Sequence, residues 1–286
     1  MNQPVDQQVD GLIRFRLDLG YDGTLYAGWA KQPRLVTVQG ELLKALTTIF
    51  GESKDDFAMR VAGRTDAGVH ALGQVAHIDL SKAQLRRIGR GKPLAVRLNS
   101  LLPDGIRVYS IAEAPAGFDA RFSATHRRYR YRIGDAKAFI SPLEARFTLW
   151  LGFALDTDAM QRAADNLIGL HDFASFCKAR EGATTIRELR EITVGRNPDG
   201  VVTIELQADA FCHNMVRSIV GALISVGGGK AEPADVQRIL GQKSRVGSFK
   251  VVAPHGLTLL EIGYPKDDEL AGQAEKARNM RSLDEN

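Results

Sequence analysis

Alternation of apolar and polar residues predicts strands along the whole chain. Every second residue from Ile13 to Leu19 is apolar, and the residues between are charged. In residues 125–133, Tyr129, Tyr131 and Ile133 alternate with arginines in the same way. A two-residue period is that of a half-buried strand. Further strands are predicted at 57–62, 74–80, 106–114 and 256–264, with a hairpin over 186–208 that turns at Asn-Pro-Asp-Gly.

Apolar residues at helical spacing predict helices between these strands. Residues 37–51 begin with a capping residue, Thr37, and end at a stop residue, Gly51. Further helices are expected within 93–102, 156–169, 211–227 and 232–241. Strand, helix and strand thus recur in two similar α/β halves. The short connections favour an α+β fold with mainly antiparallel sheets.

The pattern also predicts the domain limits. We expect a flexible N-terminus over 1–11, an N-terminal domain over 12–114 and a C-terminal domain over 115–265. Residues 266–286 are highly charged and predict either a frayed tail or a marginal helix.

Composition indicates a globular protein with two modest cores, since 44% of the 286 residues are hydrophobic and 25% charged. No apolar run reaches the length of a membrane span, and the first residues lack the pattern of a secretion signal, so we expect no membrane partner and a cytoplasmic location. The two cysteines, Cys177 and Cys212, are too few for a structural zinc site and are expected to be reduced core thiols.

Basic residues are clustered although the net charge is only +4. One cluster lies at 86–92, and residues 121–132 hold five arginines and no acid. Arginines interleaved with aromatic residues predict a phosphate-rich partner. The glycines at 226–229 close a helix instead of opening one, which argues against a nucleotide-binding loop. We expect neither metal nor cofactor.

The loop at 63–70 holds an arginine, an aspartate and a histidine between two predicted strands. Asp66 could simply form a local turn, with Gly68 at positive φ. Alternatively, Arg64 keeps Asp66 ionised while Gly63 and Gly68 let a bulky substrate approach the backbone. Spacing alone does not decide between the two.

Six segments in order resemble the tRNA pseudouridine synthase A family, from about Leu12 to Tyr264. These are "YDGTLYAGW" (21–29), "AGRTDAGVHA" (62–71), "FDARFSA" with "RRYRYRI" (118–133), "LIGLHDFASF" (167–176), "FCHNMVRSIVG" (211–221) and "APHGLTLLEIGY" (253–264). The chain departs from the family pattern at Ala30, at Cys212 and in residues 86–93.

The resemblance implies conversion of uridine to pseudouridine at positions 38, 39 and 40 of the anticodon stem-loop of tRNA, by a homodimer with a central RNA-binding cleft. Asp66 would be the catalytic carboxylate, attacking ribose C1′, adding to the uracil ring or removing a proton from C2′. The target base would be flipped out of the stem, and Arg64 would fill the gap. The remaining substrate-binding residues would be Tyr129, stacking on uracil or relaying a proton, Leu259 as the pocket floor, and Phe118, Arg121, Phe122, Arg128 and Arg130.

Two other classes of protein fit parts of the sequence. A catalytically silent RNA-binding protein would carry the same arginine clusters but would not need Asp66. A nuclease is disfavoured because no metal cluster or histidine pair is visible. His70 is as consistent with bracing the loop as with chemistry.

Overall fold

The structure, a computed structural model, describes residues 11–51, 56–89, 91–139, 141–178, 184–244 and 249–278. Its strands are β1 (Leu12–Tyr21), β2 (Arg60–Val61), β3 (His70–Ser81), β4 (Ile106–Glu113), β5 (His126–Gly134), β6 (Leu149–Trp150), β7 (Gly169–Asp172), β8 (Ile186–Arg196), β9 (Val202–Ala208) and β10 (Leu257–Gly263). Its α-helices are α1 (Val38–Phe50), α2 (Lys82–Ile88), α3 (Leu94–Asn99), α4 (Thr157–Asp165), α5 (Met215–Gly227), α6 (Pro233–Gln242) and α7 (Leu270–Lys276).

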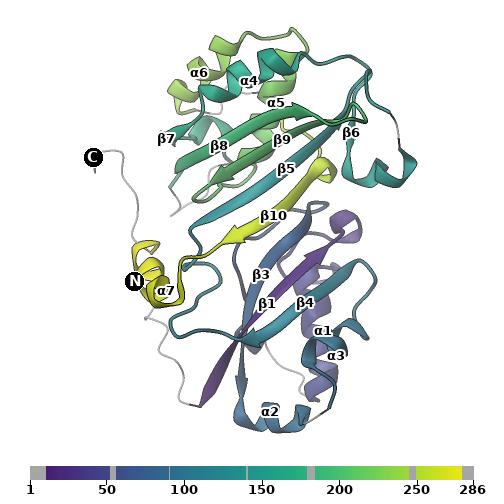
Figure 1. The fold of residues 1–286 in the computed structure, drawn as a ribbon, viewed down its shortest axis with the longest axis vertical. Helices are drawn as coiled ribbons and strands as arrows, with labels where there is room; N and C mark the ends of the chain where they lie inside the picture. Colours follow the sequence, from purple (N-terminus) through teal and green to yellow (C-terminus); the bar gives the residue numbers. More distant parts are fainter. Residues whose placement is uncertain are drawn as a thin grey trace.

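The strands of both halves form one ten-stranded sheet, in the order β4-β1-β3-β10-β5-β9-β8-β7 (Figure 1). The short strands β2 and β6 pair with β3 and β5, respectively. The closing strand β10 joins the halves, because it pairs antiparallel with β5 and, over two residues, parallel with β3. The predicted α+β class and the mainly antiparallel pairing are confirmed. The predicted halves therefore share a sheet, and their division into domains at 114/115 stays a prediction.

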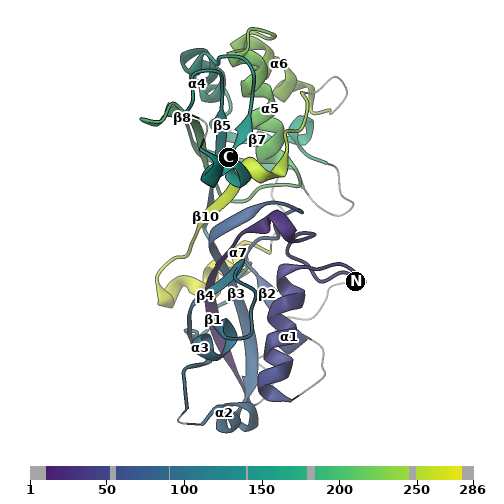
Figure 2. The same cartoon turned by 90° about the vertical axis from the view of Figure 1, so that its right-hand side faces the viewer.

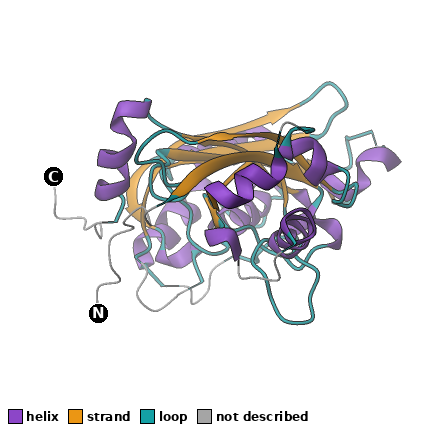
Figure 3. Cartoon of the chain, turned by 90° about the horizontal axis from the view of Figure 1, so that it is seen from below, coloured by secondary structure: helices purple, strands orange, loops and turns teal. Residues whose placement is uncertain are grey.

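The main helices cover one face of this sheet. In Figure 2, α1 and the α5–α6 pair lie on the same side of the strands, and Figure 3 shows the strands as a curved layer with most helices below it. Thr37 caps α1, which ends at a left-handed Gly51 as predicted. The helix expected from residue 211 begins only at Met215, because Asn214 has a left-handed backbone. The middle of the sheet, where β3, β10 and β5 meet, lies between the two helical groups.

Two strand boundaries differ from the prediction. The strand expected from Gln74 begins at His70, because Ala71 already pairs with Tyr21 on β1 and His70 with Thr258 on β10. Pairing on both sides extends the strand into a segment that shows no clear alternation. The strand expected at 57–62 is reduced to the two residues of β2, since Asp56–Ala58 form a 3-10 turn.

The predicted tail contains a packed helix. Leu270 is only 2% exposed and Ala274 is also buried. The Ser123 hydroxyl donates a hydrogen bond to the Leu270 carbonyl at 3.2 Å. Of the two alternatives for this segment, the helix is correct for 270–276, while residues 279–286 lie outside the described residues.

Removing residues 267–286 should therefore lower the melting temperature. Burial of a leucine side chain contributes roughly 1.5–3 kcal/mol, so we expect a drop of roughly 5 °C or more. Thermal unfolding followed by circular dichroism measures it, with removal of only 279–286 as the matched control. Equal melting temperatures for both truncations would contradict the docking of α7.

The expectation of two free thiols is wrong in this structure. Cys177 and Cys212 form a disulfide, with Cα atoms 5.7 Å apart. Their separation of 35 residues conceals this proximity, because the backbone brings the two segments together: the Lys178 N–H donates to the His213 carbonyl at 2.9 Å. None of the helices in the described ranges is both long enough and apolar enough to span a membrane.

Candidate active site around Asp66

A buried polar network anchors the loop between β2 and β3 to side chains of β1 and β3. The Tyr21 hydroxyl lies 2.8 Å from the Thr65 hydroxyl. The Gln74 amide donates to the Tyr21 hydroxyl at 3.1 Å and to the Gly63 carbonyl at 2.9 Å. Buried polar groups that satisfy one another fix a single arrangement. The residues flanking Asp66 are thus anchored to β1 and β3.

The segment 26–29 holds the same loop from the side. The Trp29 N–H donates to the Thr65 carbonyl at 3.1 Å, and the Gly68 N–H to the Tyr26 carbonyl at 3.3 Å. Gly28 has a φ of +91°, and a Cβ there would lie 2.8 Å from the Thr65 carbonyl oxygen. Gly68 has the positive φ expected from the sequence, +76°. Two glycines therefore allow the two segments to lie in contact.

Asp66 faces two basic side chains, Arg217 and His213, from the segment that leads into α5. Its Oδ2 lies 3.4 Å from Nη1 of Arg217, and its Oδ1 lies 3.6 Å from Nε2 of His213. Within the described chain, its carboxylate accepts no hydrogen bond from the turn, which is closed by the Val69 N–H on the Asp66 carbonyl. The side chain is 37% exposed. Asp66 is therefore an accessible, charge-paired carboxylate, not a turn-forming aspartate.

Tyr129 and Leu259 lie side by side in the sheet near this carboxylate. They are directly paired residues of β5 and β10, so their side chains share a face of the sheet, and both are buried. Burial raises the pKa of Tyr129 far above its usual value, and the charges of Tyr21 and Asp66 add to the rise. The ring of Phe211 packs edge-on against Tyr129 at 5.2 Å between centroids. This neighbourhood is apolar, and the Tyr129 hydroxyl keeps its proton.

Arg127 ties together the segments around the site. Its guanidinium donates to the carbonyls of Asp209 at 2.6 Å, Arg121 at 2.9 Å and Ala62 at 3.1 Å. Burial lowers the pKa of Arg127 from its usual value. One half-buried arginine thus links the start of the Asp66 loop, the "FDARF" segment and the segment that leads into α5.

His70 supports the loop through hydrogen bonds to the backbone, which is one of the two roles that the sequence allowed for it. Its Nδ1 accepts a hydrogen bond from the Gly23 N–H at 3.0 Å, and its Nε2 lies 3.1 Å from the His255 carbonyl. Burial lowers the pKa of His70, which favours the neutral ring. Both ring nitrogens are engaged by backbone groups, so His70 has no free nitrogen with which to bind a metal together with Asp66. The described residues contain no cluster of three potential metal ligands.

The other predicted site residues are dispersed. Arg64 is exposed, and its guanidinium makes no hydrogen bond or ion pair within the described ranges. The expected pairing of Arg64 with Asp66 is therefore absent, and Arg217 pairs with Asp66 instead. Arg121 is exposed, and its guanidinium lies 5.0 Å from the centre of the half-buried Phe122 ring. Phe118 is only 2% exposed and packs on Tyr264 at 5.1 Å, so its expected contact with RNA is replaced by a place in the core.

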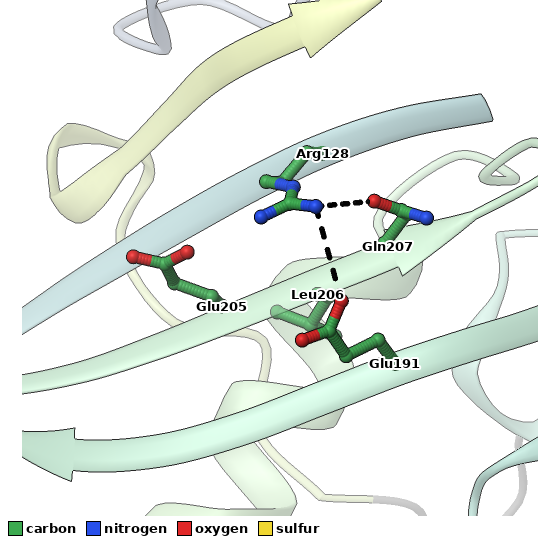
Figure 4. Close-up of a pocket in the computed structure, with 5 residues that line it drawn as sticks. All are labelled: Arg128, Glu191, Glu205, Leu206 and Gln207. Atoms are coloured by element: carbon green, nitrogen blue, oxygen red, sulfur yellow. Dashed lines mark hydrogen bonds and ion pairs between the residues drawn. The ribbon is translucent and has the colours of Figure 1, made fainter. Parts of the chain in front are cut away.

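Arg128 and Arg130 lie on the face of β5 opposite Tyr129. Arg128 donates to the Gln207 amide oxygen at 2.7 Å and lies 3.9 Å from Glu191, over a hollow of only ≈ 10 Å³ (Figure 4). Arg130 pairs with Glu205 at 2.7 Å. Strand alternation separates these arginines from the Tyr129 side of the sheet. The alternation in the sequence had already placed these arginines on the face opposite Tyr129, and their pairing with neighbouring strands argues against the predicted contact with RNA.

A second cleft, of ≈ 420 Å³, also lies on the Arg130 side of the sheet. Its lining includes Arg130, Arg132, Glu144, Leu72 and Tyr109, but not Asp66 or Tyr129.

Comparison with known proteins decides the family. Residues 163–265 match the family model described as tRNA pseudouridine synthase. Curated proteins named tRNA pseudouridine synthase A match nearly end to end: 52% identity with that of Leifsonia xyli (96% of this chain, 99% of the relative), 51% with that of Streptomyces avermitilis (97% of each) and 47% with that of Mycobacterium leprae (94% and 96%). The chain belongs to the tRNA pseudouridine synthase A family. As a member it is an isomerase of the pseudouridine synthase class.

The sequence had identified this family but not all of the residues that this pseudouridine synthase brings to Asp66. Arg217, His213 and Arg127 were absent from the predicted site. The segment "FCHNMVRSIVG" carries two of them, but His213 precedes the left-handed Asn214 that caps α5, so helical spacing could not have predicted that His213 and Arg217 meet at one carboxylate. Their distance from Asp66 along the chain hid the contact.

Proposed function

We propose that this isomerase acts on uridines 38, 39 and 40 of the anticodon stem-loop of tRNA, with Asp66 as the single catalytic carboxylate and the target base flipped out of the stem. The observation that carries the proposal is the setting of Asp66, an accessible carboxylate that faces Arg217 and His213 close to the apolar pair of Tyr129 and Leu259.

The reaction needs one carboxylate because the base never leaves the site. The glycosidic bond from N1 to C1′ breaks, the uracil turns, and C5 joins C1′, with the C5 hydrogen lost as a proton. A hydrolytic glycosidase needs a second carboxylate to handle water or the leaving group. Here the guanidinium of Arg217 lies against Oδ2 of Asp66, and the Asp66 carboxylate is the group that attacks carbon or accepts a proton. The buried floor keeps water from the detached base.

We assign RNA binding to two exposed arginines, Arg64 in the Asp66 loop and Arg121 in the "FDARF" segment. Arg64 is free to enter the stem and take the place of the flipped base, which offsets part of an unstacking cost of a few kcal/mol. Arg121 and Phe122 offer a cation and a ring to the backbone and bases. Leu259 would floor the uracil pocket, and Tyr129 would stack on the base or relay a proton at C5.

Tyr129→Phe separates these two roles, because it keeps the ring and removes the hydroxyl. We expect tRNA affinity to survive and the single-turnover rate to fall by roughly tenfold or more, as for loss of a proton-relaying group. Filter binding and quenched-flow kinetics measure the two quantities. A wild-type rate in the variant would reduce Tyr129 to stacking.

Salt dependence distinguishes the two faces of the sheet. Each phosphate neutralised adds about 0.7 to 0.9 to the slope of log affinity against log salt. We expect Arg64→Ala and Arg121→Ala to flatten that slope. Arg128→Ala with Arg130→Ala should leave it unchanged, because both side chains are paired with neighbouring strands on the other face. A flatter slope for the second pair would place RNA on that face.

The resemblance further supports a homodimer that works in the cytoplasm, where tRNA is found. Sedimentation equilibrium of the full chain tests the dimer, and a monomer at micromolar concentration would contradict it.

The target positions are tested with an unmodified tRNA transcript and its variants. We expect chemical mapping to find pseudouridine at uridines 38, 39 and 40, and to lose each signal when that uridine becomes cytidine. Modification outside the anticodon stem-loop would contradict the proposed substrate.

A further inference from the structure

The two cysteines of the chain meet beside the Asp66 site. Cys177 follows the 3-10 turn Ala174–Phe176, and Cys212 precedes α5. They are bonded to each other, with Cα atoms 5.7 Å apart, a separation usual for a bridge. The Lys178 N–H on the His213 carbonyl holds the two segments side by side.

The segment that carries Cys212 touches the site on both sides of that residue. His213 places Nε2 3.6 Å from Oδ1 of Asp66, and Phe211 packs on Tyr129. Arg217 faces the other oxygen, Oδ2, at 3.4 Å. With the bridge closed, each carboxylate oxygen therefore has a basic side chain against it, and His213 lies where a substrate atom would have to approach Oδ1.

We propose that Cys177 and Cys212 form a reversible thiol–disulfide modification site, whose oxidation holds His213 against Asp66 and slows the isomerisation. This inference rests on the proposed role of Asp66. The bridge is the covalent link between the 211–213 segment and Cys177. Reduction removes this link, so that His213 can move away from Oδ1.

The proposed oxidant is a small-molecule disulfide. The difference in exposure between the two cysteines decides which of them reacts with it first. Cys212 is partly exposed, whereas Cys177 is only 2% exposed. The Cys212 thiolate attacks one sulfur of the small disulfide and releases one thiolate. The Cys177 thiolate then attacks the Cys212 sulfur and releases the second. Two cysteine thiols lose two electrons, the small disulfide becomes two thiols, and the cysteine protons end on these products.

A pair of this kind suits an enzyme of a reducing compartment. Disulfides there are usually transient and serve catalysis or redox sensing. The bridge joins two short segments beside the site, so its state changes the position of His213 more than the sheet that supports Asp66.

The test compares the full-length protein after treatment with dithiothreitol and with oxidised glutathione. Thiol titration should give two free cysteines in the first state and none in the second. The single-turnover rate on tRNA should be roughly tenfold lower in the oxidised state and recover with dithiothreitol, while tRNA affinity stays within twofold. Cys212→Ser and Cys177→Ser should keep the rate of the reduced protein under both treatments.

His213→Gln separates this mechanism from a general effect of oxidation. The variant should still form the bridge, but its rate should change by less than about twofold between the two states. A wild-type rate indifferent to a bridge that forms, thiols that stay free in oxidised glutathione, or a tenfold response retained in His213→Gln would each overturn the proposal.

The NMR signals of the His213 ring, assigned with His213→Gln, give a readout that does not depend on activity. They should differ between the two states, and identical signals would overturn the inference. A reduced protein that makes no pseudouridine would instead refute the proposed function, and the ring signals would still decide whether the bridge moves His213.

Discussion

Asp66→Asn should abolish pseudouridine formation and leave the fold and tRNA binding intact. The amide has nearly the shape of the carboxylate, but it neither attacks carbon effectively nor accepts a proton. Loss of a group that acts in the chemical step costs several orders of magnitude in rate. Binding should persist, because it resides in dispersed cationic and stacking contacts, and removing a negative charge near phosphate favours it. Single-turnover kinetics and filter binding on the same preparations measure both effects.

Asp18→Asn is the matched control. Asp18 lies on β1 and contacts Arg16 at 2.7 Å and the Ser110 hydroxyl at 2.8 Å, without a contact to the Asp66 loop among the described residues. Its asparagine variant should react at nearly the wild-type rate. A near wild-type rate for Asp66→Asn would contradict the catalytic role of Asp66 and would leave it as a residue that shapes the turn.

Arg217→Leu should lower the rate by roughly 100-fold or more, the second largest effect expected. Its Nε donates to the Val252 carbonyl at 2.8 Å, which aims Nη1 at Asp66. Because the side chain is largely buried, its charge is poorly screened by water. Without it, the Asp66 carboxylate loses the charged partner that holds it in place. Affinity for tRNA should fall much less than the rate.

Two further variants test this prediction: Arg217→Lys is the conservative substitution, and Arg238→Leu is the control at an exposed ion pair. Lysine keeps the charge but loses the planar geometry that satisfies Val252 and Asp66 together, so an intermediate rate is expected. Arg238 forms an exposed pair with Asp235 on α6, and exposed pairs contribute little. A rate for Arg217→Leu as high as that of Arg238→Leu would remove Arg217 from the site.

Local patterns sufficed for much of the fold. Periodicity and caps predicted α1 and its limits, and alternation placed Tyr129, Tyr131 and Ile133 on the buried face of β5. These features depend on neighbours within a few residues. The continuity of the sheet did not follow, since it depends on the two-residue contact of β10 with β3.

The site was predictable only where the family motif names a residue. Asp66 stands out in "GRTDAG", but its partners come from α5, some 150 residues later. Phe118 was misplaced because sequence shows that a residue is aromatic, not which neighbours cover it. The cysteine pair was missed for the same reason.

The central claim is that the protein converts uridine to pseudouridine with its own residues alone, and loss of the C5 hydrogen tests it most directly. The protein is incubated in EDTA with tRNA carrying tritium at C5 of uridine, on a transcript that remains folded. We expect tritium release equal to the pseudouridine formed, with the RNA chain intact and no free uracil. Strand cleavage, free uracil, binding without tritium release, or release only after a divalent ion is restored would contradict the account.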